Sequence, residues 1–376
     1  MIIETVELKN YRNISSLFLT LHPGINILHG DNAQGKTNFL ESIYVCATGR
    51  SHRTNRDSEL IMMGMDVARI KLIIAKEHGI KDQLDMQIRQ KNNGAKNKSG
   101  SKSALVNSMP IGRLGELYGL ANIVIFSPED LQLIKSGPNL RRRFMDMELC
   151  QLYPNYYHNL RRYHRVLKQR NNLLKTLQKN RKNLEAMNNL DAWDIQLSEY
   201  GIKIIEIREE FIEKIKEIAA KIHKDITAQN ENLEIFYKKS VNEQVFLEKL
   251  IKTRERDILQ GTTSSGIHKD DILLTINNLD VHKFASQGQQ RTAALALKLS
   301  EIQLVEEETG QKPVLLLDDV LSELDSGRQS YLFSAINSIQ IIITTTGKDE
   351  IFENIKNRQN AGIFTVSAGI ISSKIS

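Results

Sequence analysis

The chain has 376 residues, of which 40% are hydrophobic and 26% are charged, and its 51 Lys and Arg against 45 Asp and Glu give a net charge of +6. This length suits two domains, or one large domain with an insertion, and so mild a charge does not by itself identify a nucleic-acid-binding protein. Only two cysteines, Cys46 and Cys150, are present, which excludes a disulfide framework, and no signal peptide or apolar run of about 20 residues is apparent. We therefore expect a cytoplasmic α/β protein that does not enter a membrane.

The N-terminal third is predicted to consist mainly of strands. Alternating apolar residues indicate short strands within the first 30 residues, and apolar residues at helical spacing over 40–47 predict a helix directly after them. Residues 69–75 and 83–89 are expected to pair as a hairpin. The polar, Gly- and Ser-bearing segment 91–103 is basic and predicts a mobile loop, which could touch a polyanion or simply be solvated.

The middle of the chain is predicted to be helical. A strand over 122–126 and a short helix over 127–137 precede a change to long side chains at helical spacing. Two long helices over 140–180 and 192–223, separated by a short break at 183–190, should fold back on each other as an antiparallel arm.

The C-terminal part returns to α/β character. A helix is expected to start at Ser286, and two apolar strands follow at 314–317 and 339–346. A strand that is apolar on both faces needs parallel neighbours, and the first 50 residues are expected to supply them. We thus expect an α/β lobe interrupted by an insertion, with its N-terminal part in residues 1–125, the inserted helical lobe in 126–285 and its C-terminal part in 286–376.

The strongest motif is the segment from Gly30 to Thr37, which matches G-x-x-x-x-G-K-[ST] between a predicted strand and a predicted helix. Its backbone amides and the helix N-terminus can surround a phosphate, Lys36 can reach the β- and γ-phosphates, and the Thr37 hydroxyl can ligate Mg²⁺. The plainer alternative is a Gly-rich turn before a helix. The motif predicts that ATP with Mg²⁺ binds here, at Gly30, Asp31, Asn32, Ala33, Gln34, Gly35, Lys36 and Thr37.

Two acids end the apolar strand over 314–317. The carboxyl end of a parallel strand is where ligands bind, so Asp318 is predicted to hold Mg²⁺ and Asp319 to polarise the attacking water. Alone, the two acids could equally start a helix. With Lys36 they make the predicted catalytic set.

Ser286 and Gln289 form a capping-box pattern, which by itself indicates only a well-capped helix. Its position before the acidic strand resembles the signature motif of ATP-binding-cassette ATPases. That resemblance implies that Ser286, Gly288 and Gln289 meet the γ-phosphate of a nucleotide held by a second protomer. Residues 322–325 resemble the D-loop of the same ATPases.

Further segments are similar to the RecF family, in the branch of these ATPases that includes the SMC proteins. The matching segments, in chain order, are residues 8–13, 35–38, 49–53, 126–130, 137–138, 141–146, 266–271, 288–291 and 318–325. The resemblance implies an ABC/SMC-type P-loop ATPase head with an inserted helical lobe that contains a short antiparallel coiled coil. It also implies nucleotide contacts by Arg12 and Asn38.

The same resemblance implies a role in recombinational repair, replication restart and the SOS response. ATP would drive homodimerisation on DNA, at duplexes, gaps or junctions of single and double strands, with weak DNA-dependent hydrolysis. RecR, RecO and RecA would be the partners, with RecA being loaded on single-stranded DNA.

Three positions depart from the patterns of these families. Residues 267–269 read Ile-His-Lys where RecF proteins have Pro-His-Arg, and residues 344–346 are threonines where a transporter ATPase has histidine. Asp319 stands where Glu is usual, and its shorter reach predicts slow hydrolysis, as in a switch.

Positive charge gathers at the predicted arm, where residues 141–182 hold 12 Lys and Arg and two acids. A solvated helix face is the plainer explanation. The family resemblance favours DNA phosphate contacts without base readout, which predicts a steep salt dependence and weak sequence preference. The candidate residues are Arg141, Arg142, Arg143, Arg161, Arg162, Arg165 and Arg170. Arg50, His52, Arg53 and Arg56 form a second basic cluster, which could contact DNA or could equally be a structural loop on the nucleotide side.

Three other functions are considered. An SMC-like tether or clamp would need far longer heptad arms. A transporter ATPase is disfavoured by the threonines at 344–346 and by the basic arm. An ATPase-coupled nuclease would need a further acidic cluster, and none is apparent.

Overall fold

The computed structural model describes residues 1–76, 79–91, 99–181, 183–336, 338–346 and 361–373. The chain divides into two units, residues 1–130 with 298–376 and residues 131–297. The divisions follow Asp130 and Leu297, whereas the sequence placed them at 125/126 and 285/286. The second division falls inside helix α9 (Gln287–Thr309), so its N-terminal end lies in the second unit.

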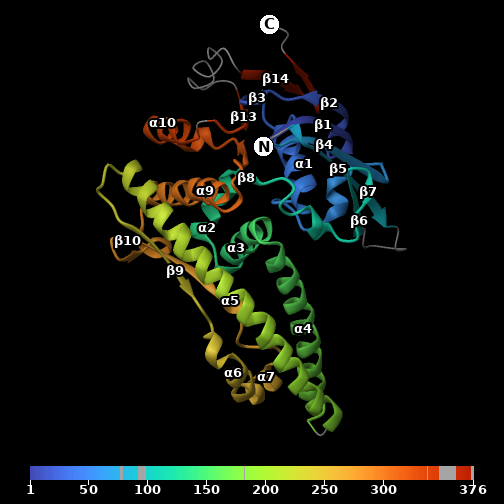
Figure 1. The fold of residues 1–376 in the computed structure, drawn as a ribbon, viewed down its shortest axis with the longest axis vertical. Coiled ribbons are helices and arrows are strands. Elements are labelled where there is room, and N and C mark those ends of the chain that lie inside the picture. Colours follow the sequence, from blue (N-terminus) through green and yellow to red (C-terminus); the bar gives the residue numbers. More distant parts are fainter. Residues whose placement is uncertain (77–78, 92–98, 182, 337, 347–360, 374–376) are drawn as a thin grey trace. The chain divides into compact units, whose positions relative to one another are not determined.

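The first unit contains a mainly parallel sheet with the strand order β15-β14-β3-β13-β12-β8 (Figure 1). Its strands are β3 (Ile25–His29), β8 (Ile123–Phe126), β12 (Val314–Asp318), β13 (Ile341–Thr345), β14 (Ala361–Ser367) and β15 (Ile370–Ser373). Residues of β8, β12 and β13 are buried throughout, because the strands are apolar on both faces.

The expectation that the first 50 residues flank β12 is wrong. The parallel neighbours of β12 are β13 and β8, and β3 lies one strand further away, paired with β13 and β14. Each strand is recognisable from its own residues, but the order of strands depends on pairings between distant segments.

A second, antiparallel sheet in the same unit has the order β2-β1-β4-β5-β6-β7. It consists of β1 (Ile2–Tyr11), β2 (Ile14–Thr20), β4 (Val67–Ala75), β5 (Lys81–Lys91), β6 (Ser99–Val106) and β7 (Met109–Pro110). The predicted hairpin of 69–75 with 83–89 is confirmed as β4 and β5. The predicted loop 91–103 is wrong at both ends, where β5 and β6 extend, and its residues 92–98 lie outside the described part.

Helix α1 (Lys36–Thr48) contacts strands of both sheets, and its buried residues include Phe39, Leu40 and Ile43. Besides residues 298–309 of α9, the described part of this unit contains the 3-10 turns Asp57–Leu60, Leu114–Leu117, Pro128–Asp130 and Leu321–Glu323, and helix α10 (Ser326–Ala335).

The second unit is built around two long helices, α4 (Pro154–Lys179) and α5 (Leu184–Ile226), which pack against each other, with the longer α5 continuing beyond α4 (Figure 1). The predicted antiparallel pair is therefore confirmed, but the break is shorter than expected. Asn183 accepts a hydrogen bond from the Ala186 backbone N–H at 2.9 Å and caps α5, so the helix begins before residue 190.

Smaller elements complete the second unit. These are α2 (Leu131–Lys135), α3 (Pro138–Leu152), α6 (Phe246–Lys252), α7 (Arg254–Gln260), α8 (Val281–Phe284), 3-10 turns at Glu243–Val245 and Ile267–Lys269, and the sheet β11-β10-β9, formed by β9 (Leu233–Lys238), β10 (Asp271–Ile276) and β11 (Leu279–Asp280). Across the described residues, none of the helices is both long and apolar enough to cross a membrane.

Candidate functional site

The predicted phosphate-binding loop, Gly30–Thr37, joins β3 to α1. Gly35 is the N-cap of α1 with φ of 114°, a conformation that favours glycine, and no side chain caps the helix. Because no side chain caps them, the first backbone N–H groups of α1 can donate to an anion bound at the loop, as in other helix N-termini that bind anions.

Lys36 lies in the first turn of α1 and folds back over the loop. Its Nζ donates to the carbonyl oxygens of Gly30 at 2.6 Å and Asp31 at 2.8 Å, and only 6% of the residue is exposed. Burial lowers the pKa of the Lys36 ammonium group, and the nearby carboxylates of Asp319, Asp318 and Asp31 oppose that shift. An ammonium group held so close to the helix N-terminus is a counter-charge for phosphate.

Asp318 and Thr37 meet at the carboxyl end of β12. The Thr37 Oγ1 donates to Asp318 Oδ1 at 2.9 Å, and Thr344 Oγ1 donates to the same oxygen at 2.8 Å. Burial raises the pKa of the Asp318 carboxyl, and the hydrogen bonds from Thr344 and Thr37 oppose this. A hydroxyl and a carboxylate oxygen at this distance are the hard donors that Mg²⁺ prefers, so the residues fit the predicted metal.

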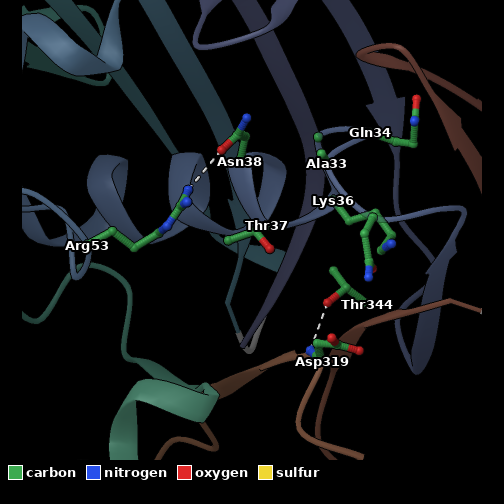
Figure 2. Close-up of a pocket in the computed structure, with 10 residues that line it drawn as sticks. Ala33, Gln34, Lys36, Thr37, Asn38, Arg53, Asp319 and Thr344 are labelled. Atoms are coloured by element: carbon green, nitrogen blue, oxygen red, sulfur yellow. Dashed lines mark hydrogen bonds between the residues drawn. The ribbon is translucent and has the colours of Figure 1, made fainter. Parts of the chain in front are cut away.

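Asp319 lines a cavity of about 350 Å³ beside the loop (Figure 2). Its φ of 53° is unusual for a residue other than glycine, and its backbone N–H donates to Thr344 Oγ1 at 3.0 Å. The lining residues are Asn32, Ala33, Gln34, Gly35, Lys36, Thr37, Asn38, Arg53, Asp319 and Thr344.

Arg12, a predicted nucleotide contact, is held by Glu41 of α1. Its Nε and Nη2 donate to the two carboxylate oxygens of Glu41 at 2.9 and 2.8 Å, and the Ser51 hydroxyl donates to the same carboxylate at 2.6 Å. Burial alone would raise the pKa of the Glu41 carboxyl, but the hydrogen bonds from Arg12 and Ser51 lower it overall. Arg12 is thus tied to the helix that carries the loop, and it is not among the residues that line the cavity.

Arg53 was predicted to contact DNA, and the structure places it in the wall of the cavity. Its Nη1 donates to Asn38 Oδ1 at 2.9 Å (Figure 2) and lies 3.6 Å from Glu41 Oε2. A position on the nucleotide side was the alternative to DNA contact for the cluster that contains Arg53, and this geometry fits that alternative. Thr344 was not predicted at this site. The signals for Thr344 were its place at the end of an apolar strand, the same position that marked Asp318, and the histidine that transporter ATPases have in this segment.

The predicted signature residues lie in the second unit, at the start of α9. The Ser286 backbone N–H donates to Gln289 Oε1 at 2.9 Å, and the Gln289 backbone N–H donates to Ser286 Oγ at 3.2 Å, which is a reciprocal capping box. Gln289 Nε2 also donates to Glu231 Oε1 at 2.9 Å, a partner the sequence did not suggest. Gly288 follows in the first turn of the helix.

The predicted DNA-binding arginines separate into two groups. Arg161, Arg162 and Arg165 are exposed on α4, Arg50 is exposed after α1, and Arg143 is half-buried. Arg141 is 7% exposed and donates to both oxygens of Asp271 at 2.7 and 2.9 Å.

Arg170 is fully buried and bonded to Asp194 and Asp257. The expectation that Arg141 and Arg170 contact phosphates is therefore wrong, because both guanidinium groups are buried and already bonded to carboxylates. Arg142 is half-buried and donates to the carbonyl oxygen of Asp270 at 2.5 Å.

His268, in the segment that departs from the family pattern, is enclosed in the second unit. Its Nδ1 lies 2.8 Å from the Tyr163 hydroxyl and its Nε2 lies 3.1 Å from the Thr263 carbonyl oxygen. Burial lowers the pKa of His268 to about 4, so the ring is neutral near pH 7. Among the described residues, no cluster of three or more His, Cys, Asp or Glu side chains offers a further metal site.

Several known proteins are similar to this chain in sequence and in fold. The model of the RecF/RecN/SMC N-terminal domain matches residues 2–372. The protein named DNA replication and repair protein RecF from Lachnospira eligens is 50% identical, covering 98% of this chain and 98% of its own, and its namesake from Clostridium tetani is 44% identical, covering 98% and 99%.

Solved structures agree with the relatives. A structure of the recombination mediator protein RecF with ATP, from the RecFOR pathway, superposes with a TM-score of 0.89 at 34% identity and covers 99% of this chain and 97% of its own. A Smc head domain from Pyrococcus furiosus, at 15% identity and a TM-score of 0.54 over 99% and 95% of the two chains, shares the fold, which confirms the predicted fold class. The chain therefore belongs to the RecF family of DNA replication and repair proteins.

Proposed function

We propose that this protein binds ATP at the Gly30–Thr37 loop and uses slow hydrolysis to open and close a homodimer on DNA during recombinational repair. The observation that carries the proposal is that Lys36 and Thr37 line one cavity at the carboxyl end of the parallel sheet, while the Thr37 hydroxyl donates to Asp318 at 2.9 Å. Family membership and the ATP named in the related RecF structure support the same nucleotide.

In the proposed complex, ATP phosphates take the place of the loop carbonyls at Lys36. The α1 amides and the Lys36 ammonium group then neutralise phosphate charge. Thr37 and Asp318 would hold Mg²⁺, which supplies further charge neutralisation when bound. Asp319 would orient the attacking water, and its short side chain favours slow turnover.

The proposed homodimer would place Lys36 of one protomer opposite Ser286 of the other. The capping box fixes the Ser286 hydroxyl at the N-terminal end of α9, where a helix start can meet a second anion. Two identical composite sites are what a twofold dimer produces.

DNA binding is assigned to the exposed arginines Arg161, Arg162 and Arg165 on α4, with Arg50 as a second contact. Such contacts reach phosphates and carry no base readout, so binding should depend on ionic strength more than on sequence. The name of the related structure places that protein in the RecFOR pathway. For this chain we propose the same setting, in which RecO and RecR act with it to load RecA at gaps or junctions.

The proposal is tested by measuring molecular mass by light scattering, with and without ATP and duplex DNA. Wild type should be monomeric alone and dimeric with ATP, and the DNA complex should weaken steeply from about 50 to about 200 mM salt. Lys36→Ala should stay monomeric with ATP, whereas Lys71→Ala, which removes an equal charge from β4, should behave as wild type. A dimer that forms equally without nucleotide, or in Lys36→Ala, would contradict the proposal.

A further inference from the structure

The hairpin β14–β15 ends in a two-residue turn, Ala368–Gly369. Ser367 pairs with Ile370 across the turn, and φ is 48° at Ala368 and 79° at Gly369. Two positive φ values in a two-residue loop are those of a type I′ turn, in which the backbone N–H groups at the tip stay available to an outside acceptor.

That outside acceptor is Gln34 of the phosphate-binding loop. The Ala368 backbone N–H donates to Gln34 Oε1 at 2.6 Å, and the Gly369 backbone N–H donates to the Gln34 carbonyl oxygen at 2.8 Å. Asn13 Nδ2 donates to the same carbonyl at 3.2 Å. Gln34 is one of the residues that line the cavity, but in Figure 2 its side chain points away from Lys36 and Thr37.

The hairpin backbone lies against the loop without room for an added methyl group. A Cβ on Gly369 would come within 2.2 Å of the Asn13 carbonyl oxygen, and a Cβ on Gly30 would come within 2.2 Å of the Val366 carbonyl oxygen. Neither backbone oxygen can move as a flexible side chain would. The first glycine of the loop and the tip of the hairpin are therefore both in close contact with their neighbours.

The loop needs such support because its backbone is unusual around Gln34. Ala33 has φ of 64° and Gly35 has φ of 114°, so Gln34 lies between two residues in left-handed conformations. A positive φ at alanine is unfavourable by itself and persists only where the surroundings impose it. The two hydrogen bonds from the hairpin tip are made to Gln34, the residue between Ala33 and Gly35, and so hold this part of the loop in place.

We infer that Gln34 is a positioning residue through which the C-terminal hairpin holds the phosphate-binding loop ready for ATP. This inference rests on the proposed function, in which the loop binds the nucleotide. Gln34 does not touch phosphate through its side chain; it fixes the loop whose amides do. Without the hairpin contact, part of the free energy of ATP binding must be used to order the loop. Nucleotide affinity is then weaker, and the rate of the chemical step is unchanged.

The test compares KM and kcat for ATP hydrolysis, and the Kd for ATP, in Gln34→Met and Gly369→Ala. Gln34→Met removes the acceptor at nearly constant volume, and Gly369→Ala forces the hairpin tip away from Asn13 without altering the loop. Gln87→Met on β5 is the matched control for the first variant. Gly310→Ala is the control for the second, because Gly310 also has a positive φ, of 66°, but no neighbour within 4 Å of an added Cβ.

The expected result is a rise of about 3- to 10-fold in KM and Kd in Gln34→Met, as for the loss of one hydrogen bond, and at least as large a rise in Gly369→Ala. In both, kcat at saturating ATP should stay within about twofold of wild type. Thermal unfolding without nucleotide, compared with the controls, identifies a variant that has simply lost its fold. If both folded variants keep wild-type KM and Kd, or lose kcat alone, the positioning role is wrong; if wild type itself does not bind ATP, the proposed function fails instead.

Discussion

Asp318→Asn should lower the rate of ATP hydrolysis by at least about 100-fold, the scale seen when one preorganised electrostatic contact is lost from an active site. Asn keeps an oxygen that can accept the hydrogen bonds from Thr37 and Thr344, so the site should keep its shape. What is lost is the negative charge that would hold Mg²⁺. ATP binding through Lys36 and the α1 amides should persist.

The measurement is steady-state phosphate release, with ATP affinity measured separately on the same preparations. Asp66→Asn is the matched control, because Asp66 is exposed in the same unit and lies outside the cavity. Hydrolysis by Asp318→Asn within about threefold of wild type would remove Asp318 from the catalytic set.

Arg170→Met should destabilise the protein by about 3–5 kcal/mol, the cost of breaking a buried ion pair by removing one partner. Arg170 is fully buried, and its Nε donates to Asp194 at 2.5 Å while its Nη1 donates to Asp257 at 2.8 Å. Both carboxylates are themselves buried, so the substitution leaves negative charge in the interior. Because these residues lie on α5 and α7, the loss should loosen the junction of three helices.

The midpoint of denaturant-induced unfolding, followed by circular dichroism, gives the comparison. Arg161→Met on the same helix is the matched control, because Arg161 is exposed and its loss should change stability by less than about 0.5 kcal/mol. Equal midpoints for the two variants would show that Arg170 is not an internal ion-pair partner.

Arg170 also shows what the sequence could and could not predict. The buried residues of α4 include Tyr163, Val166, Arg170, Leu174 and Leu177, a series at helical spacing. This spacing predicts that Arg170 faces the interior of the unit and that Arg161 and Arg165 face the solvent. Its partners could not be predicted, because Asp257 is 87 residues away in the sequence.

At the candidate site, too, the features within one short segment could be predicted and the contacts between distant segments could not. The loop from Gly30 to Thr37 was predictable because one short segment contains a strand end, a glycine turn and a helix start. The pairing of Arg12 with Glu41 and the contact of Gln34 with the C-terminal hairpin were not, since each depends on segments that only the fold brings together. The order of the parallel strands, where the prediction for β12 was wrong, has the same cause.

A composite ATP site built from two protomers is tested most directly by mixing two inactive variants. Lys36→Ala keeps an intact Ser286, and Ser286→Arg keeps an intact Lys36, so a mixed dimer has one complete site. Each variant alone should be almost inactive in ATP hydrolysis. Because Lys36→Ala does not pair with itself, hydrolysis by the mixture above the sum of its two components reports the mixed dimer. The mixture should exceed that sum and reach at most about half of wild-type activity, since a mixed dimer has one working site of two. A mixture no more active than its components, or a Ser286→Arg variant that is fully active alone, would contradict a site shared between protomers.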